Sequence, residues 1–117
     1  MDEFAEKLAG IGIPALVFLA AMSGTGLAGA AAVTAALAAL GPGGMIGGIV
    51  TLLIMGGGIG VITKYGYSAV MIATSKKIMV KQNLTKEEMY QKIDKMPITK
   101  NLKARIKSEI DKAEETK

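Results

Sequence analysis

Hydrophobic positions are concentrated in one long stretch, Leu8–Thr63, which contains no Asp, Glu, Lys or Arg. Lys7 and Lys64 flank it, and only hydroxyl groups provide side-chain polarity within it: Ser23, Thr25, Thr34, Thr51 and Thr63. Surface helices of water-soluble domains need a polar face, whereas a bilayer core about 30 Å thick needs roughly 20 apolar residues per crossing helix. The pattern therefore predicts membrane-embedded helices over Leu8–Thr63.

The first half of this stretch predicts helical segments with two interruptions. Residues 1–7 carry acidic side chains that suit the first turns of a helix, where the helix dipole favours negative charge. Leu8–Met22 continues apolar, with Pro14 as a kink or a break. Ser23–Gly26 either interrupts the helix or packs it closely, and an alanine-rich run, Leu27–Leu40, follows. Whether this half forms one span, two spans or a re-entrant segment stays open.

The second half predicts a helical hairpin. Gly41–Gly44 reads Gly-Pro-Gly-Gly, residues that end one helix and suit the first turn of the next. Met45–Thr63 is the strongest single span, because its length covers about 28 Å at a rise of 1.5 Å per residue. The predicted fold is therefore all-α, with two main hydrophobic helices joined at the Gly-Pro-Gly-Gly turn, an interfacial segment and a soluble two-helix basic tail.

Small residues recur at helical spacing and predict close helix packing, within one chain or between chains. One set of small residues occupies every fourth position, so its members would form a stripe along one face of a continuous helix. Three Gly-x-x-x-Gly pairs, a spacing that lets membrane helices approach closely, start at Gly43, Gly44 and Gly56. The expected packing residues are Ala20, Gly24, Ala28, Ala32, Ala36, Gly43, Gly44, Gly47, Gly48, Gly56 and Gly60.

The residues after this stretch predict a membrane interface. Tyr prefers the headgroup level, and Lys can extend its charge out of an apolar surface. Ser68–Ser75 is apolar but too short to cross a bilayer, and with Ile78–Val80 it predicts an interfacial helix anchored by lysines. The alternative is an ordinary helical extension into water. The expected interface residues are Lys64, Tyr65, Tyr67, Lys76 and Lys77.

A change in composition divides the chain into a hydrophobic region, 1–81, and a charged tail, 82–117. Thr85 and Glu88 have the spacing of a capping box at the start of a helix, and Pro97 ends that helix. Thr99 can cap a second helix. The apolar positions are Met89, Ile93 and Met96 in the first helix and Leu102, Ile106, Ile110 and Ala113 in the second. Two short amphipathic helices bury little alone, so we expect them to pack on each other, on the membrane surface or on another chain.

The composition excludes several kinds of chemistry. The chain has no Cys and no His, so it has no disulfide, no zinc or copper site built on these ligands, no His base and no Cys nucleophile. The carboxylate pairs Glu87/Glu88 and Glu114/Glu115 are adjacent in sequence, and adjacent positions do not share a helix face. We therefore expect no enzyme activity, no cofactor and no metal.

Two glycine patterns and the basic tail also fall short of a binding motif. Gly56–Gly60 lacks the Lys-Ser/Thr ending of a phosphate loop, and Gly24–Gly29 has no strand before it and no acidic residue where a dinucleotide site needs one. Over residues 76–117, only Tyr90 could stack on a base, and seven acidic residues offset twelve basic ones. No nucleic acid is expected as a partner. The acidic start of the chain predicts neither a secretory signal nor a transit peptide.

Two segments resemble a known family. Ala21–Gly26 leads into an alanine-rich run, and Gly41–Gly56 combines a Gly-rich turn with Gly-Ile-Val-Thr-Leu. Over Gly12–Gly60 the chain resembles the interferon-alpha-inducible family of small hydrophobic proteins. The resemblance implies membrane residence and a role in cell death or antiviral defence without catalysis. The Lys-rich tail, Lys76–Lys117, departs from the family pattern and suits a microbial relative.

Together these features predict a small integral membrane protein that self-associates and permeabilises membranes, with a role in cell death or in antiviral or anti-phage defence. Its expected partners are the lipid bilayer, further copies of the chain and a protein bound by the tail. The Lys-rich tail places both termini in the cytoplasm by the positive-inside rule, at the cytoplasmic membrane in a bacterium. The alternatives are a holin-like lysis protein, a membrane anchor without a pore that recruits a partner through its tail, and a soluble helical protein that hides Leu8–Thr63 inside an oligomer.

Overall fold

The computed structural model describes residues 1–40 and 46–115, and for residues 46 and 47 the backbone alone. The described residues form eight helices and no strand, so the all-α prediction is confirmed for them. The predicted Gly41–Gly44 corner lies outside the described residues. The helices are α1 (Asp2–Ile11), α2 (Ile13–Gly24), α3 (Gly29–Leu40), α4 (Ile46–Ile54), α5 (Gly58–Tyr65), α6 (Tyr67–Lys81), α7 (Lys86–Asp94) and α8 (Lys100–Glu115).

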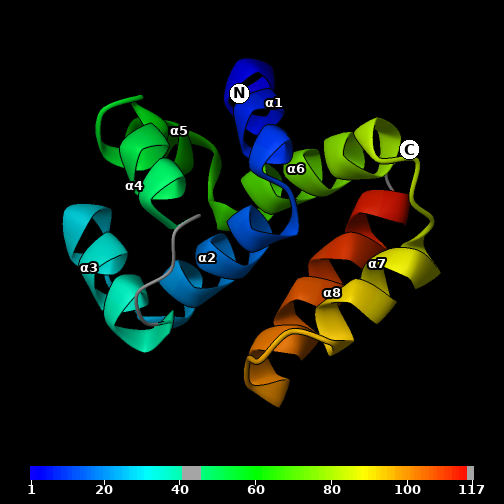
Figure 1. The fold of residues 1–117 in the computed structure, drawn as a ribbon. Helices are drawn as coiled ribbons and strands as arrows, with labels where there is room; N and C mark the ends of the chain where they lie inside the picture. The colour runs from blue at the N-terminus through cyan, green and yellow to red at the C-terminus, as the bar shows by residue number, and fades with distance from the viewer. Residues whose placement is uncertain (41–45, 116–117) are drawn as a thin grey trace.

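Helix α2 is the centre of the fold. It contacts α1, α3, α4, α6 and α8, and Figure 1 shows it between the α3–α5 group on one side and the α7–α8 pair on the other. Nearly all of its side chains are apolar and most are buried, with Leu16, Phe18 and Leu19 fully enclosed. A helix that is hydrophobic all round is stable where neighbours cover every face, which explains its central place.

The chain turns sharply between α1 and α2, at an angle of 114°. Gly12 joins the two helices with φ +98° and ψ −153°, a backbone conformation open to glycine. Pro14 lies in the first turn of α2, where its missing N–H would have no helical partner in any case. The expected break within Leu8–Met22 is therefore present, but it lies at Gly12, and Pro14 belongs to the first turn of the second helix.

The small-residue stripe does not follow one continuous helix. Helix α2 ends at Gly24 and α3 begins at Gly29, so Ser23–Gly26 interrupts the helix, as one of the two alternatives predicted. Gly26 has φ +72°, which ends the regular helix locally. Ala20 and Ala36 consequently lie on different helices.

The strongest predicted span, Met45–Thr63, is not a single helix either. The described part divides into α4 and α5, which are bent by 68°. Gly57 adopts the left-handed conformation with φ +78°. The N–H groups of Met55 and Gly56 both donate to the carbonyl oxygen of Thr51, at 2.9 and 3.1 Å, so these donors stay bonded at the bend. Two glycines at the turn make it sterically inexpensive.

No single helix among the described residues is both long and apolar enough to cross a bilayer. Two bent pairs, α1 with α2 and α4 with α5, reach the required length and hydropathy only together. The all-α class is thus established for the described residues, whereas the transmembrane hairpin stays a prediction.

Helix α6 packs inside the fold, because it contacts α1, α2, α5 and α8. Its buried residues are Val70, Met71, Thr74, Ser75 and Ile78. A free extension into water does not describe this position, whereas the interfacial placement of the segment stays a prediction.

The tail forms an antiparallel pair of helices, α7 and α8 (Figure 1), and α8 also covers α6 and α2. The predicted capping box is present, with Thr85 and Glu88 bonded reciprocally. Thr99 caps α8 by accepting from the N–H of Leu102 at 3.2 Å. The first helix ends at Asp94, before Pro97, as expected. The predicted apolar positions face the interior: Met89, Ile93, Ile106, Ile110 and Ala113 are buried, and Met96 and Leu102 are half-buried.

Candidate functional site

The predicted packing alanines serve contacts within the chain. Ala20 of α2 and Ala32 and Ala36 of α3 are fully buried, and these two helices are in contact. Ala28 lies between the helices and is exposed. Gly43 and Gly44 are outside the described residues, and Gly47 is described only as part of the α4 backbone.

The remaining glycines of the predicted set fall into two groups. Gly24 faces the guanidinium group of Arg105, and a Cβ atom on Gly56 would lie 2.7 Å from the carbonyl oxygen of Leu52. Gly48 and Gly60 are exposed, and a Cβ atom on either would meet no atom of the described residues within 4 Å. These two therefore have open space beside them that the single chain does not use.

The predicted interface residues make protein contacts. The Nζ atom of Lys64 lies over the ring of Tyr65 at 5.3 Å, while Tyr67 and Lys76 are half-buried. Lys77 is paired with Glu6 at 3.2 Å, and Lys81 pairs with the same carboxylate at 3.0 Å. A tertiary contact between α1 and α6 thus occupies Lys77, a residue that the sequence assigned to lipid headgroups.

Helices α3, α4 and α5 present a surface without charge as far as Thr63, within the described residues. At the α4–α5 corner, the exposed fractions are 53% for Ile54 and 83% for Met55. Leu27, just before α3, is 49% exposed. We call the exposed residues of Leu27–Leu40 and Gly48–Thr63 the uncharged surface. Exposed apolar side chains on a shared surface are typical of sites that bind a membrane or another protein.

Hydroxyl groups in the charge-free stretch are bonded to their own helices. Ser23 donates to the carbonyl of Ala20 at 2.9 Å, and Thr25 donates to that of Met22 at 2.8 Å. Thr34 and Thr63 donate to carbonyls four residues earlier, at 3.1 and 2.9 Å. This arrangement leaves these hydroxyl groups satisfied without water.

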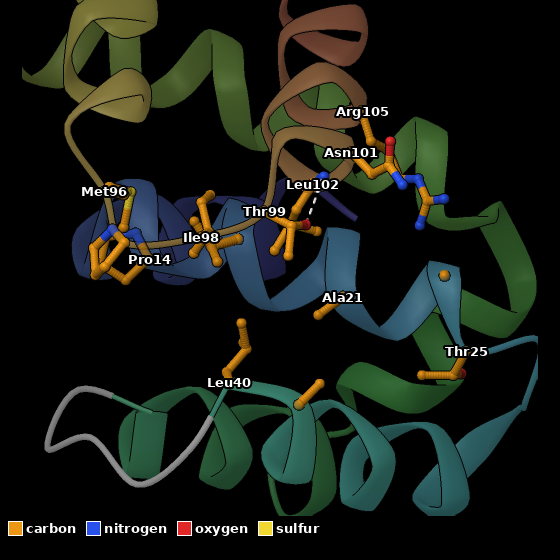
Figure 2. A pocket seen from close by; sticks show the side chains of 14 residues that line it. Pro14, Ala21, Thr25, Leu40, Met96, Ile98, Thr99, Asn101, Leu102 and Arg105 are labelled. Atoms are coloured by element: carbon orange, nitrogen blue, oxygen red, sulfur yellow. Dashed lines mark hydrogen bonds between the residues drawn. The ribbon is translucent and has the colours of Figure 1, made fainter.

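A cleft of about 670 Å³ lies where the charge-free helices meet the tail (Figure 2). One wall is α2 and the end of α3, and the other is the α7–α8 connection with the start of α8. Among the described residues, Arg105 is the one charged side chain that lines the cleft, and its Nη1 atom donates to the carbonyl oxygen of Ala20 at 3.2 Å. No local sequence signal indicates this cleft, because its two walls, residues 14–40 and 96–105, are far apart in the chain.

A polar cluster ties α7 to α8 on the outside of the tail. The hydroxyl of Tyr90 donates to Asp111 and, at 3.1 Å, to the carbonyl of Lys107. Lys86 is paired with the same Asp111 carboxylate at 2.9 Å. Hydrogen bonds from Tyr90 and then Lys86 lower the pKa of Asp111, whereas burial raises the pKa of Tyr90. The cluster is a structural link, since its members are bonded to one another.

The described residues contain no group of three or more acidic side chains that could hold a metal ion. Comparison of the chain with protein-family models, curated proteins and solved structures finds no match to any of them. The resemblance to the interferon-alpha-inducible family therefore stays a prediction from the sequence.

Proposed function

We propose that this chain is a membrane protein that self-associates through its glycine-containing helices and permeabilises the bilayer. The uncharged surface is the observation that carries the proposal. A helix facing water normally exposes charged or strongly polar side chains, but α3, α4 and α5 expose Ala, Gly, Thr, Ile and Met up to Thr63. A surface of this kind is compatible with a lipid environment.

Local hydrogen bonding also supports a location of these helices in lipid. In a hydrocarbon environment every backbone and hydroxyl donor needs a partner within the protein. The hydroxyls of Ser23, Thr34 and Thr63 meet this demand within their own helices, and so do the N–H groups of Met55 and Gly56 at the α4–α5 bend. Two bent pairs, α1–α2 and α4–α5, would then enter the bilayer as broken or re-entrant spans. The finer arrangement that we propose is a hairpin of α3 and α4–α5 with its corner at Gly41–Gly44.

Self-association follows from the open glycines. Gly48 and Gly60 lie on the uncharged surface, and no described neighbour lies within 4 Å of the position that a Cβ atom would take. Such positions let the backbone of a second helix approach closely in a membrane. Assembly through them gives a pore lined without charged groups, which would select poorly among ions. This property suits killing or lysis, and hence the proposed role in cell death or anti-phage defence.

Orientation follows from the tail. It carries most of the basic residues of the chain, so the positive-inside rule places both termini in the cytoplasm. Deleting the tail is a poor test of its role, because α8 covers buried residues of α6 and α2. Point substitutions at positions with open space test the proposal more directly.

Dye release from liposomes tests the proposal, with Gly48→Leu and Gly60→Leu as the informative variants. Leucine adds apolar surface, and a Cβ atom at either position meets no described neighbour within 4 Å, so folding and insertion should persist while close helix approach is blocked. Gly10→Leu is the matched control, since Gly10 is also exposed and open but lies in α1, outside the Gly-x-x-x-Gly pairs. We expect release by the wild type and the control, and at least a tenfold loss in both variants.

Two outcomes contradict the proposal. Protein that stays with the vesicles but releases no dye contradicts permeabilisation and is the behaviour of an anchor. Protein that stays in the aqueous phase contradicts membrane residence itself.

A further inference from the structure

The cleft between α2 and the α7–α8 connection is polar at one end and apolar at the other. Figure 2 shows the two ends separated along the cleft. The apolar end is lined by Pro14, Leu40, Met96 and Ile98, and the polar end by Thr25, Asn101 and Arg105. A ligand that fills this cleft therefore needs a polar group joined to a hydrocarbon.

The charge at the polar end is positive and not neutralised locally. No acidic side chain lines the cleft, and no ion pair involves Arg105 in the part of the chain that the structure describes. The guanidinium group carries five N–H donors, and its bond to the carbonyl of Ala20 engages Nη1. The remaining donors form a planar fork, which fits a carboxylate or a phosphate.

We propose that this cleft binds a single-chain amphiphile with an anionic head, either a fatty-acid carboxylate or a phosphate ester. The head contacts Arg105 and Asn101, and the hydrocarbon chain extends past Ala21 toward Leu40 and Ile98. The cleft volume of about 670 Å³ lies within the range of about 300–1,000 Å³ that is usual for small-molecule sites. This site goes beyond the proposed function, because it is formed within one folded chain and requires neither self-association nor permeabilisation.

Photo-crosslinking tests the site on the full chain. The probe is dodecanoate with a diazirine near the end of its chain, followed by mass-spectrometric mapping of the adducts. We expect saturable labelling within residues 14–21, 39–40 and 96–102. Arg105→Gln should weaken labelling at least tenfold, which corresponds to about 1.4 kcal/mol of binding free energy. Lys92→Gln is the charge-matched control, since Lys92 is exposed on α7 and does not line the cleft.

A second variant keeps the test independent of any folding defect at Arg105. Ala21→Leu retains the guanidinium but fills the middle of the cleft, and it should also reduce labelling at least tenfold. The methyl ester of the probe, which has no anionic head, should label as weakly as Arg105→Gln. Competition by unlabelled dodecanoate against dodecyl phosphate shows which head is preferred, and either preference supports the proposal.

Three results would overturn it: labelling spread evenly over the apolar helices, equal labelling by the acid and its methyl ester, or labelling unaffected by both Arg105→Gln and Ala21→Leu. Inorganic phosphate that competes as well as dodecyl phosphate would also overturn it, because the hydrocarbon would then contribute nothing. None of these results depends on dye release, so the failure of this site and the failure of permeabilisation are distinguishable.

Discussion

Arg105 of α8 donates a hydrogen bond from Nη1 to the carbonyl oxygen of Ala20 in α2, at 3.2 Å and across 85 residues of sequence. The guanidinium group reaches this carbonyl by passing over Gly24, whose missing side chain leaves the necessary room. The contact joins the charged tail to the central apolar helix beside the cleft. Arg105 is a second side-chain donor to this carbonyl, which also accepts from Ser23, and the helix dipole favours a positive charge near the C-terminal end of α2.

A double-mutant cycle measures this link. Gly24→Ala places a methyl group against the guanidinium and displaces it, while Arg105→Gln removes the charged donor. Each single variant should lower the free energy of unfolding by about 0.5–1.5 kcal/mol, the usual range for one hydrogen bond. Because both disrupt one contact, the double variant should cost less than the sum. Denaturant unfolding followed by circular dichroism provides the values, and strict additivity would show that the two residues do not interact.

Two glycines of α5 should respond in opposite directions to alanine. A Cβ atom on Gly58 would lie 2.5 Å from Cε1 of Phe4 and 2.9 Å from the Cα atom of Leu53, so Gly58→Ala should destabilise by about 1–3 kcal/mol through overpacking. Gly60 has open space, so Gly60→Ala should stabilise by up to about 1 kcal/mol through helix propensity. Thermal midpoints of the two variants under identical conditions test the contrast, and a loss of equal size in both would contradict the close approach of Phe4 to Gly58.

Acid should weaken the α7–α8 link through Asp111. Hydrogen bonds from Tyr90 and Lys86 lower the pKa of this carboxyl below its ordinary value of 3.8. The stabilisation is therefore fully present above the ordinary pKa and is lost as the pH falls through the lowered pKa. Asp111→Asn should be less stable than the wild type near neutral pH, and the gap should close as the pH falls from about 5 to about 2. Thermal midpoints across this range measure the gap, and a constant gap would contradict the assignment.

Local sequence signals predicted the tail well. A cap is defined by Thr85 with Glu88, a helix end by Pro97, and a buried face by Ile106 and Ile110. Each of these signals involves neighbours within one or two helical turns. Such signals depend on short-range geometry, and the structure bears them out.

Long-range features could not be predicted in the same way. Glycines are tolerated within membrane helices, so nothing local showed that Gly12 and Gly57 would take positive φ values and divide the predicted spans. Lys77 was assigned to lipid because its partner, Glu6, lies on another helix about 70 residues earlier. The cleft likewise requires Arg105 to meet α2, a relationship that exists only in the folded chain.

The central claim is that the uncharged surface lies in lipid, and Met55 is the position to test, because 83% of its side chain is exposed. The chain has no Cys, so Met55→Cys carries a single environment-sensitive nitrobenzoxadiazole label, and Lys92→Cys provides an exposed control in the tail. With liposomes, we predict that the label at 55 brightens, shifts to the blue and is quenched by a lipid-borne nitroxide, while the label at 92 remains open to aqueous iodide. Iodide quenching of both labels to the same extent would contradict the location of the uncharged surface in lipid.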